Sequence, residues 1–133
     1  MIKTAKNLNV EGLIKIIEDV PNDDLPALYK LALFSVYPSI YEGFGIPVIE
    51  SLACGTPVLL SKSSSLSEAA GEGGFFCDVE NSHEIAKAMV KLVKDAALRK
   101  KLTAKGILHT KKFTQKQSAE SLMKVYEKVM KMK

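Results

Sequence analysis

The sequence predicts an α/β fold in which an open parallel sheet is flanked by helices. Short apolar runs typical of strands alternate with longer segments whose apolar residues recur at the 3.6-residue period of a helix. Clusters of glycine, proline and serine separate these segments. Hydrophobic residues make up 47% of the 133 residues, which is enough to form the core of about one domain.

The first third of the chain contains two predicted helices and one predicted strand. A short helix over residues 2–9 ends at the stop signals Asn9 and Gly12. Residues 13–17 are apolar and largely β-branched, which favours a strand. A polar turn over 20–24 follows, and its asparagine and aspartates are suitable caps for a helix over 24–32.

The middle of the chain predicts a strand, a glycine loop and a helix in succession. The apolar run 33–37 reads as a buried strand that Pro38 ends, because proline lacks the amide hydrogen that a ladder needs. Pro47 suits the first turn of a helix, which runs to about Cys54 before Gly55 at its C-terminal end. Residues 58–60 form the next short strand.

The remaining chain is mostly helical. Helical turns over 66–70 precede a fourth strand over 75–77, and three helices follow over 82–93, 95–109 and 115–131. The last of these helices has the most regular apolar stripe, which we interpret as core packing. Its members are Ala119, Leu122, Met123, Tyr126, Val129 and Met130.

Two carboxylates frame the glycine loop. The loop amides and the positive end of the following helix face one spot, which favours an anion. Glu42 lies in the loop, and Glu50 lies in a helix of otherwise apolar or small residues, so we expect Glu50 to be buried and to need hydroxyl donors. Eight residues of helix span about 12 Å. A retaining glycosidase dyad, whose carboxyls lie about 5 Å apart, is therefore disfavoured.

The segment from Pro38 to Val58, together with 65–68 and 71–75, resembles the E-x7-E signature of retaining, nucleotide-sugar-dependent glycosyltransferases of the group 1 or family 4 type. The resemblance extends from about Val20 onward. It implies a Rossmann-like sheet from the C-terminal half of a GT-B fold. It also implies that residues 1–133 are a single partial domain, without the acceptor domain and without the first half of the donor domain, where the family carries a basic pair that grips the diphosphate.

The same resemblance implies roles for individual residues. Glu42 would contact hydroxyls of the transferred sugar near the anomeric centre, and is the candidate catalytic residue. Glu50 would accept hydrogen bonds from the ribose hydroxyls of the nucleotide. Val20 and Leu25 would flank the base. The donor sugar and diphosphate would be reached by the backbone of Gly43, Phe44, Gly45 and Ile46.

The implied function is transfer of a sugar from a UDP- or GDP-linked donor to an acceptor with retention of configuration. The acceptor is a saccharide, a lipid-linked molecule or a protein, and no metal or other cofactor is expected. Two alternatives stay open. One is a non-catalytic nucleotide-sugar-binding or interaction module, and the other is a nucleotide-sugar 2-epimerase of the same architecture.

Charge and cysteine content bear on the binding partners and the cellular location of the protein. The net charge of +4 is concentrated in the second half, where lysines alternate with apolar residues. We favour a solvated helix face over nucleic-acid binding, while peripheral contact with an anionic membrane stays open. The N-terminus lacks the apolar region of a signal peptide, and Cys54 and Cys77 suit reduced thiols, so we expect a cytoplasmic protein.

Overall fold

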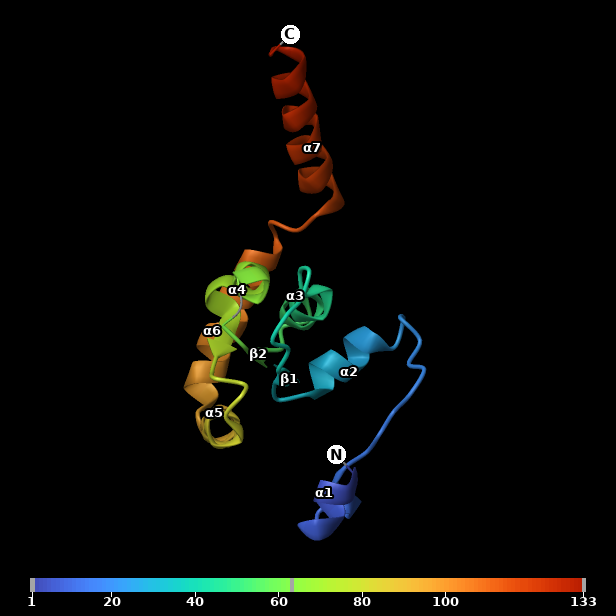
Figure 1. Cartoon of the computed structure of the whole chain (residues 1–133), viewed down its shortest axis with the longest axis vertical. Helices are drawn as coiled ribbons and strands as arrows, with labels where there is room; N and C mark the ends of the chain where they lie inside the picture. Colours follow the sequence, from blue (N-terminus) through green and yellow to red (C-terminus); the bar gives the residue numbers. More distant parts are fainter. Residues whose placement is uncertain (1, 63, 133) are drawn as a thin grey trace.

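A parallel sheet forms the centre of the computed structural model, which describes residues 2–62 and 64–132. Figure 1 shows the order of its elements. They are α1 (Ile2–Asn7), the 3-10 turn η1 (Glu11–Leu13), α2 (Leu25–Leu31), β1 (Ser35–Tyr37), α3 (Ile46–Ala53), β2 (Val58–Leu60), α4 (Ser64–Ala70), the 3-10 turn η2 (Gly71–Gly73), β3 (Gly74–Phe76), α5 (Ser82–Lys94), α6 (Ala96–Thr110) and α7 (Gln115–Met130).

Strand β2 lies between β1 and β3, and both of its pairings are parallel. Leu59, at its centre, is opposite Val36 on one side and Phe75 on the other. All three residues of β2 are buried, whereas β1 and β3 are partly exposed. The predicted α/β fold with a parallel sheet is therefore confirmed.

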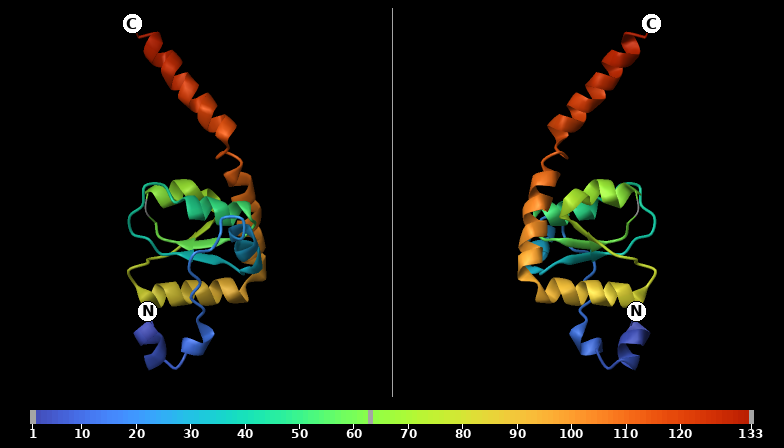
Figure 2. Two further views of the ribbon diagram at one scale, coloured as in Figure 1. Left: turned by 90° about the vertical axis from the view of Figure 1, so that its right-hand side faces the viewer. Right: turned by 90° about the vertical axis from the view of Figure 1, so that its left-hand side faces the viewer.

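The alternation of side chains along β2 divides the core into two layers. Val58 and Leu60 pack against buried residues of α3 and α4, among them Leu52 and Leu66. Leu59 points to the opposite face, where buried residues of α5 and α6 cover it. Figure 2 shows α3 and α4 on one side of the strands and α5 on the other. The helices thus cover both faces of the sheet, as the sequence predicts.

The predicted strand over 13–17 is wrong. Residues 14–18 form an irregular extended segment that leads from η1 toward α2 and lies apart from the sheet (Figure 1). Leu13 is 85% exposed, and Ile16 and Ile17 are about half exposed. A strand needs a neighbour that supplies ladder hydrogen bonds. This segment has no such neighbour among the described residues, which form three strands instead of the predicted four.

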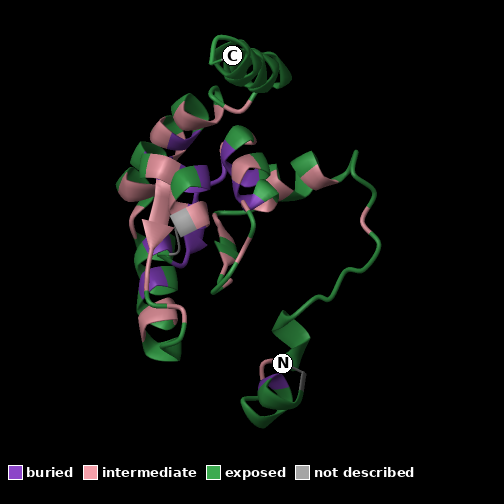
Figure 3. Ribbon diagram, turned by 45° about the horizontal axis from the view of Figure 1, so that its top comes forward, coloured by how far each residue is buried: buried purple, intermediate pink, exposed green. Residues whose placement is uncertain are grey.

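Helix α7 forms where the sequence predicts it, but its apolar stripe is not core. Thr114 caps the helix by accepting a hydrogen bond from the backbone N–H of Gln117. The side chains of Leu122, Met123 and Tyr126 are each more than half exposed. Figure 3 shows the whole helix in the colour of exposed residues, and in Figure 2 it projects away from the sheet. The stripe predicts an amphipathic helix correctly, but it does not say what covers the apolar face.

The other helices and strands begin and end within two residues of their predicted bounds. None of the helices in the described ranges is both long and apolar enough to cross a membrane.

Truncation of a buried leucine and of an exposed leucine should have different effects on stability. We expect Leu59→Ala to lower the free energy of unfolding by about 2–5 kcal/mol, because Leu59 is 1% exposed and packs between the sheet and helices α5 and α6. Leu13→Ala should change it by less than about 0.5 kcal/mol. Urea denaturation measures both values, and a comparable loss in Leu13→Ala would mean that the 13–17 segment is packed after all.

Candidate functional site

The candidate site is the connection between β1 and α3. The strand ends at Tyr37, a loop follows, and α3 begins at Ile46 with Gly45 as its N-terminal cap and Pro47 in its first turn. Gly45 is buried and has a φ of +96°, in the left-handed region that side chains disfavour. A Cβ there would also lie 2.5 Å from Leu66 Cδ2. The predicted strand–glycine loop–helix unit is present, and glycine is required at its turning point.

Glu42 is held at both its side chain and its backbone. The Tyr37 hydroxyl donates a hydrogen bond of 2.8 Å to Glu42 Oε1. The Ser65 hydroxyl, from α4, donates one of 2.9 Å to the Glu42 carbonyl oxygen. Glu42 Oε2 has no hydrogen-bond partner among residues 3–62 and 65–132, whose side chains the structure describes. The half-buried carboxylate is thus held through one of its two oxygens.

Glu50 is exposed, so the expectation that it is buried is wrong. Only one side of α3 packs against the sheet, and that side carries the buried residues Val48, Ser51 and Leu52. Glu50 lies on the other side, one turn after Ile46, which is 63% exposed. The Tyr29 hydroxyl, from α2, donates a hydrogen bond of 3.3 Å to Glu50 Oε2. An almost entirely apolar composition therefore did not mean that the helix is covered all round.

The two tyrosines were missed by the sequence analysis, although each contacts one of the two candidate carboxylates. The hydrogen bond to Glu42, followed by burial, raises the pKa of Tyr37 above its ordinary value. Burial, followed by the charge of Glu50, raises the pKa of Tyr29. Both hydroxyls are therefore protonated donors at neutral pH. The available signal was the position of Tyr37 at the end of a strand, five residues before Glu42.

The other predicted loop residues lie around this unit. Gly43 is exposed and has open space around its Cα, while the Phe44 ring packs edge-on against Phe113 with ring centroids 5.5 Å apart. Phe113 lies in the connection between α6 and α7. The α6–α7 connection thus supports the glycine loop from outside, which the sequence did not indicate.

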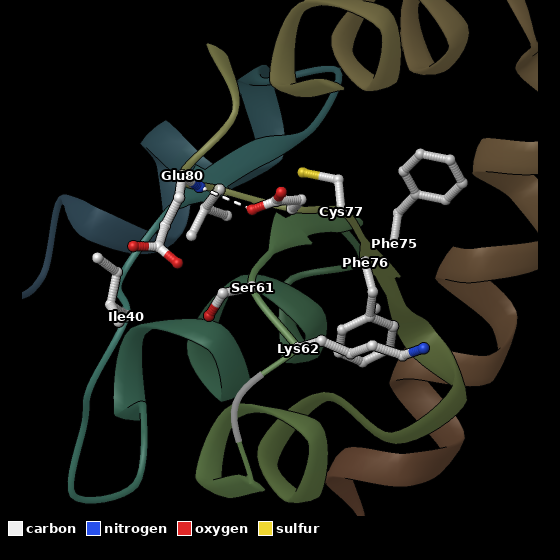
Figure 4. A pocket seen from close by; sticks show the side chains of 10 residues that line it. Ile40, Ser61, Lys62, Phe75, Phe76, Cys77 and Glu80 are labelled. Atoms are coloured by element: carbon white, nitrogen blue, oxygen red, sulfur yellow. Dashed lines mark hydrogen bonds between the residues drawn. The ribbon is translucent and has the colours of Figure 1, made fainter. Parts of the chain in front are cut away.

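A hollow of about 810 Å³ lies along β3 and beyond the carboxyl ends of β2 and β3 (Figure 4). Ligands of open α/β sheets bind beyond these strand ends. Ile40 of the predicted loop 38–45 lines it, together with Ser61 and Lys62 of the predicted loop 61–65, whose Ser63 lies outside the described residues. Neither Glu42 nor Glu50 lines this hollow.

The third predicted loop, 20–24, lines a separate hollow of about 360 Å³. Val20 contributes to it, together with Pro21, Asp24 and Leu28. Leu25 begins α2 next to it and is half-buried. The structure therefore places the two residues predicted to flank the base near each other, at the start of the helix that also carries Tyr29.

Alanine substitution at Gly45 and at Gly43 should have different effects on stability. We expect Gly45→Ala to lower the free energy of unfolding by about 1–3 kcal/mol, because alanine is strained at positive φ and its Cβ meets Leu66. Gly43→Ala, in open space, should cost less than about 0.5 kcal/mol. Thermal or urea denaturation measures the difference, and equal costs would contradict the assigned backbone geometry.

The raised pKa of Tyr37 predicts a pH dependence of stability. The folded chain holds this proton more tightly than the unfolded chain, so the stabilisation is complete below the ordinary tyrosine pKa of about 10 and is lost as pH rises through the folded-state value. We expect stability to fall more steeply in the wild type than in Tyr37→Phe above about pH 10. Urea denaturation at mildly and strongly alkaline pH provides the comparison, and parallel curves would refute the coupling.

The chain matches a known protein family. A family model described as glycosyl transferases group 1 matches residues 1–109. O-antigen chain mannosyltransferase B from Escherichia coli is 36% identical over 117 residues, which cover 88% of this chain and 31% of that protein. D-inositol 3-phosphate glycosyltransferase from Corynebacterium jeikeium (strain K411) is 32% identical over 127 residues, which cover 94% of this chain and 30% of that protein.

A solved structure has the same fold. Sucrose-phosphate synthase from Thermosynechococcus elongatus matches with a TM-score of 0.86 and 24% identity, over 98% of this chain and 34% of that chain. The fold is that of the C-terminal half of a GT-B glycosyltransferase, as the sequence resemblance implies. The chain spans about a third of the length of each of these three proteins. By its family match and by the similarity of its relatives, the chain belongs to the group 1 glycosyltransferases.

Proposed function

We propose that this chain is the donor-binding portion of a retaining glycosyltransferase that transfers a sugar from a UDP- or GDP-linked donor. The observation that carries the proposal is the placement of two carboxylates on either side of a glycine-capped helix start. Glu42 and Glu50 each have one oxygen on a tyrosine hydroxyl, and within the described chain neither is in an ion pair. Both therefore keep acceptor capacity for ligand hydroxyls.

The diphosphate of the donor would lie at the N-terminus of α3. At the start of α3 the Ile46 backbone N–H faces outward from the helix end, since Pro47 has no N–H and the Val48 N–H donates to the Gly45 carbonyl oxygen. The helix dipole adds partial positive charge at the same place. Gly45, with its positive φ, makes the turn that brings the loop onto the start of this helix. Phosphate binding at such a helix end is a general property of α/β folds.

The two carboxylates would hold opposite ends of the donor. Ribose hydroxyls would donate to Glu50, whose exposure leaves it accessible to a ligand. Hydroxyls of the sugar would donate to Glu42 near the anomeric centre. The hollow that contains Val20, with Leu25 beside it, lies by the helix that carries Tyr29, and we assign the base to this end.

Catalysis would rest on positioning and electrostatics. Retention of configuration is compatible with a route in which the leaving diphosphate takes the proton of the acceptor hydroxyl as the new glycosidic bond forms on the same face. In this route the helix N-terminus stabilises the negative charge that develops on the leaving phosphate. The proposal uses no metal ion, because the backbone supplies the positive potential.

The sugar to test first is mannose. Two of the similar proteins are named mannosyltransferases, O-antigen chain mannosyltransferase B and the serotype-specific mannosyltransferase WbdA, each 36% identical to this chain over the matched residues. Because the chain spans about a third of the first of these relatives, we assign the acceptor site to polypeptide outside these 133 residues. A module that binds the donor without transferring the sugar is the alternative.

Nucleotide binding can be measured on the chain itself. In a titration followed by NMR of backbone amides, GDP or UDP should shift signals in residues 20–24 and 38–46. Glu50→Ala should weaken nucleotide affinity by about tenfold or more, since it removes a charged acceptor. Glu42→Gln should leave the affinity for nucleotide unchanged and weaken the affinity for nucleotide-sugar.

The matched control is Glu120→Ala, on exposed helix α7, which should alter neither affinity. Shifts confined to other segments, or an equal loss of nucleotide affinity in Glu42→Gln, would contradict the proposed roles. Sugar transfer can then be measured after the chain is joined to the remaining part of a longer group 1 enzyme. Transfer by the joined protein supports the glycosyltransferase, and donor binding without transfer supports the binding module.

A further inference from the structure

We propose that Tyr37 is a positioning residue that sets the orientation of the Glu42 carboxylate toward the donor sugar. The inference rests on the proposed function of Glu42 and adds a residue to it. The hydrogen bond of 2.8 Å from the Tyr37 hydroxyl to Glu42 Oε1 is the direct observation. This length is typical of an O–H···O hydrogen bond, and a carboxylate oxygen is a stronger acceptor than a neutral one.

Tyr37 is suited to this role because its ring is anchored in the core. It is the last residue of β1, where it is opposite Leu60 of the buried central strand. The ring packs against the cluster that includes Val48 and Leu52 of α3. A tyrosine side chain has only two rotatable bonds before the hydroxyl, so a packed ring places the hydroxyl with little freedom. The core thus determines where Glu42 Oε1 lies.

The backbone of Glu42 is fixed independently. Ser65 of α4 donates its hydroxyl to the Glu42 carbonyl, across 23 residues of sequence. The bond to the carbonyl restrains the backbone and the Tyr37 bond restrains one carboxylate oxygen, so fewer Glu42 rotamers are compatible with both contacts before any ligand binds. A ligand that bound a freely rotating glutamate would have to supply that ordering entropy. Preorganisation of this kind raises affinity without adding a contact.

The second tyrosine contact provides a built-in comparison. The Tyr29–Glu50 hydrogen bond is longer, at 3.3 Å, and it is exposed. It also joins two helices instead of a strand end and the loop that follows it. In addition, the hydrogen bond to Glu42 is the largest cause of the raised pKa of Tyr37, whereas burial is the largest cause for Tyr29. Tyr37 is therefore the more tightly coupled of the two.

The test is the affinity of the wild-type chain and Tyr37→Phe for nucleotide alone and for the matching nucleotide-sugar. Phenylalanine keeps the packed ring and removes the donor. We expect Tyr37→Phe to weaken nucleotide-sugar binding by about three- to tenfold while nucleotide affinity stays unchanged. Tyr29→Phe should have a smaller effect, on both ligands. Tyr126→Phe, on exposed helix α7, is the control that should change nothing.

Two outcomes would overturn the inference. One is unchanged nucleotide-sugar affinity in Tyr37→Phe, and the other is an equal loss for both ligands, which a purely structural role would produce. If the wild type binds neither ligand, the proposed function fails, and scalar couplings of the Glu42 side chain then test the orientation without ligand. A single Glu42 rotamer in the wild type that becomes averaged in Tyr37→Phe supports positioning, and identical couplings refute it.

Discussion

The backbone of Gly45 is the constraint on which the candidate site depends. Its positive φ turns the chain from the loop into α3, and the space a side chain would need is occupied by Leu66. Leu66 is fully buried in the layer that packs against one face of β2. The start of α3 is therefore fixed by the core, and the two carboxylates on either side of it are placed by the same packing that stabilises the sheet.

Contacts from distant parts of the chain add to this constraint. Ser65 holds the backbone of Glu42 from α4, Tyr37 holds its carboxylate from β1, and Phe113 supports the Phe44 ring from the α6–α7 connection. These segments span 77 positions of sequence and meet at one loop. Because several elements support the loop, its geometry does not depend on a ligand, which suits the proposed role of positioning a donor.

Local patterns predicted the parts of the molecule that depend on local chemistry. The apolar run before Pro38, the loop glycines and Pro47 were enough to predict β1, the glycine loop and α3. Whether a segment has a partner is a tertiary property. The apolar residues 13–17 therefore could not reveal that no strand of the described chain lies beside them, and the stripe of α7 could not show that the helix is exposed. The exposure of Glu50 depends on which side of α3 the sheet covers. The hydrogen bond from Tyr29 depends on where α2 lies, and that from Tyr37 depends on how the loop after β1 folds back.

The most direct measurement is a crystal structure of the chain with a GDP- or UDP-linked sugar bound. We expect the diphosphate at the N-terminus of α3, ribose hydroxyls within hydrogen-bond distance of Glu50, and sugar hydroxyls within that distance of Glu42. A ligand seated in the hollow lined by Ser61 and Cys77, with neither carboxylate in contact with it, would contradict the account.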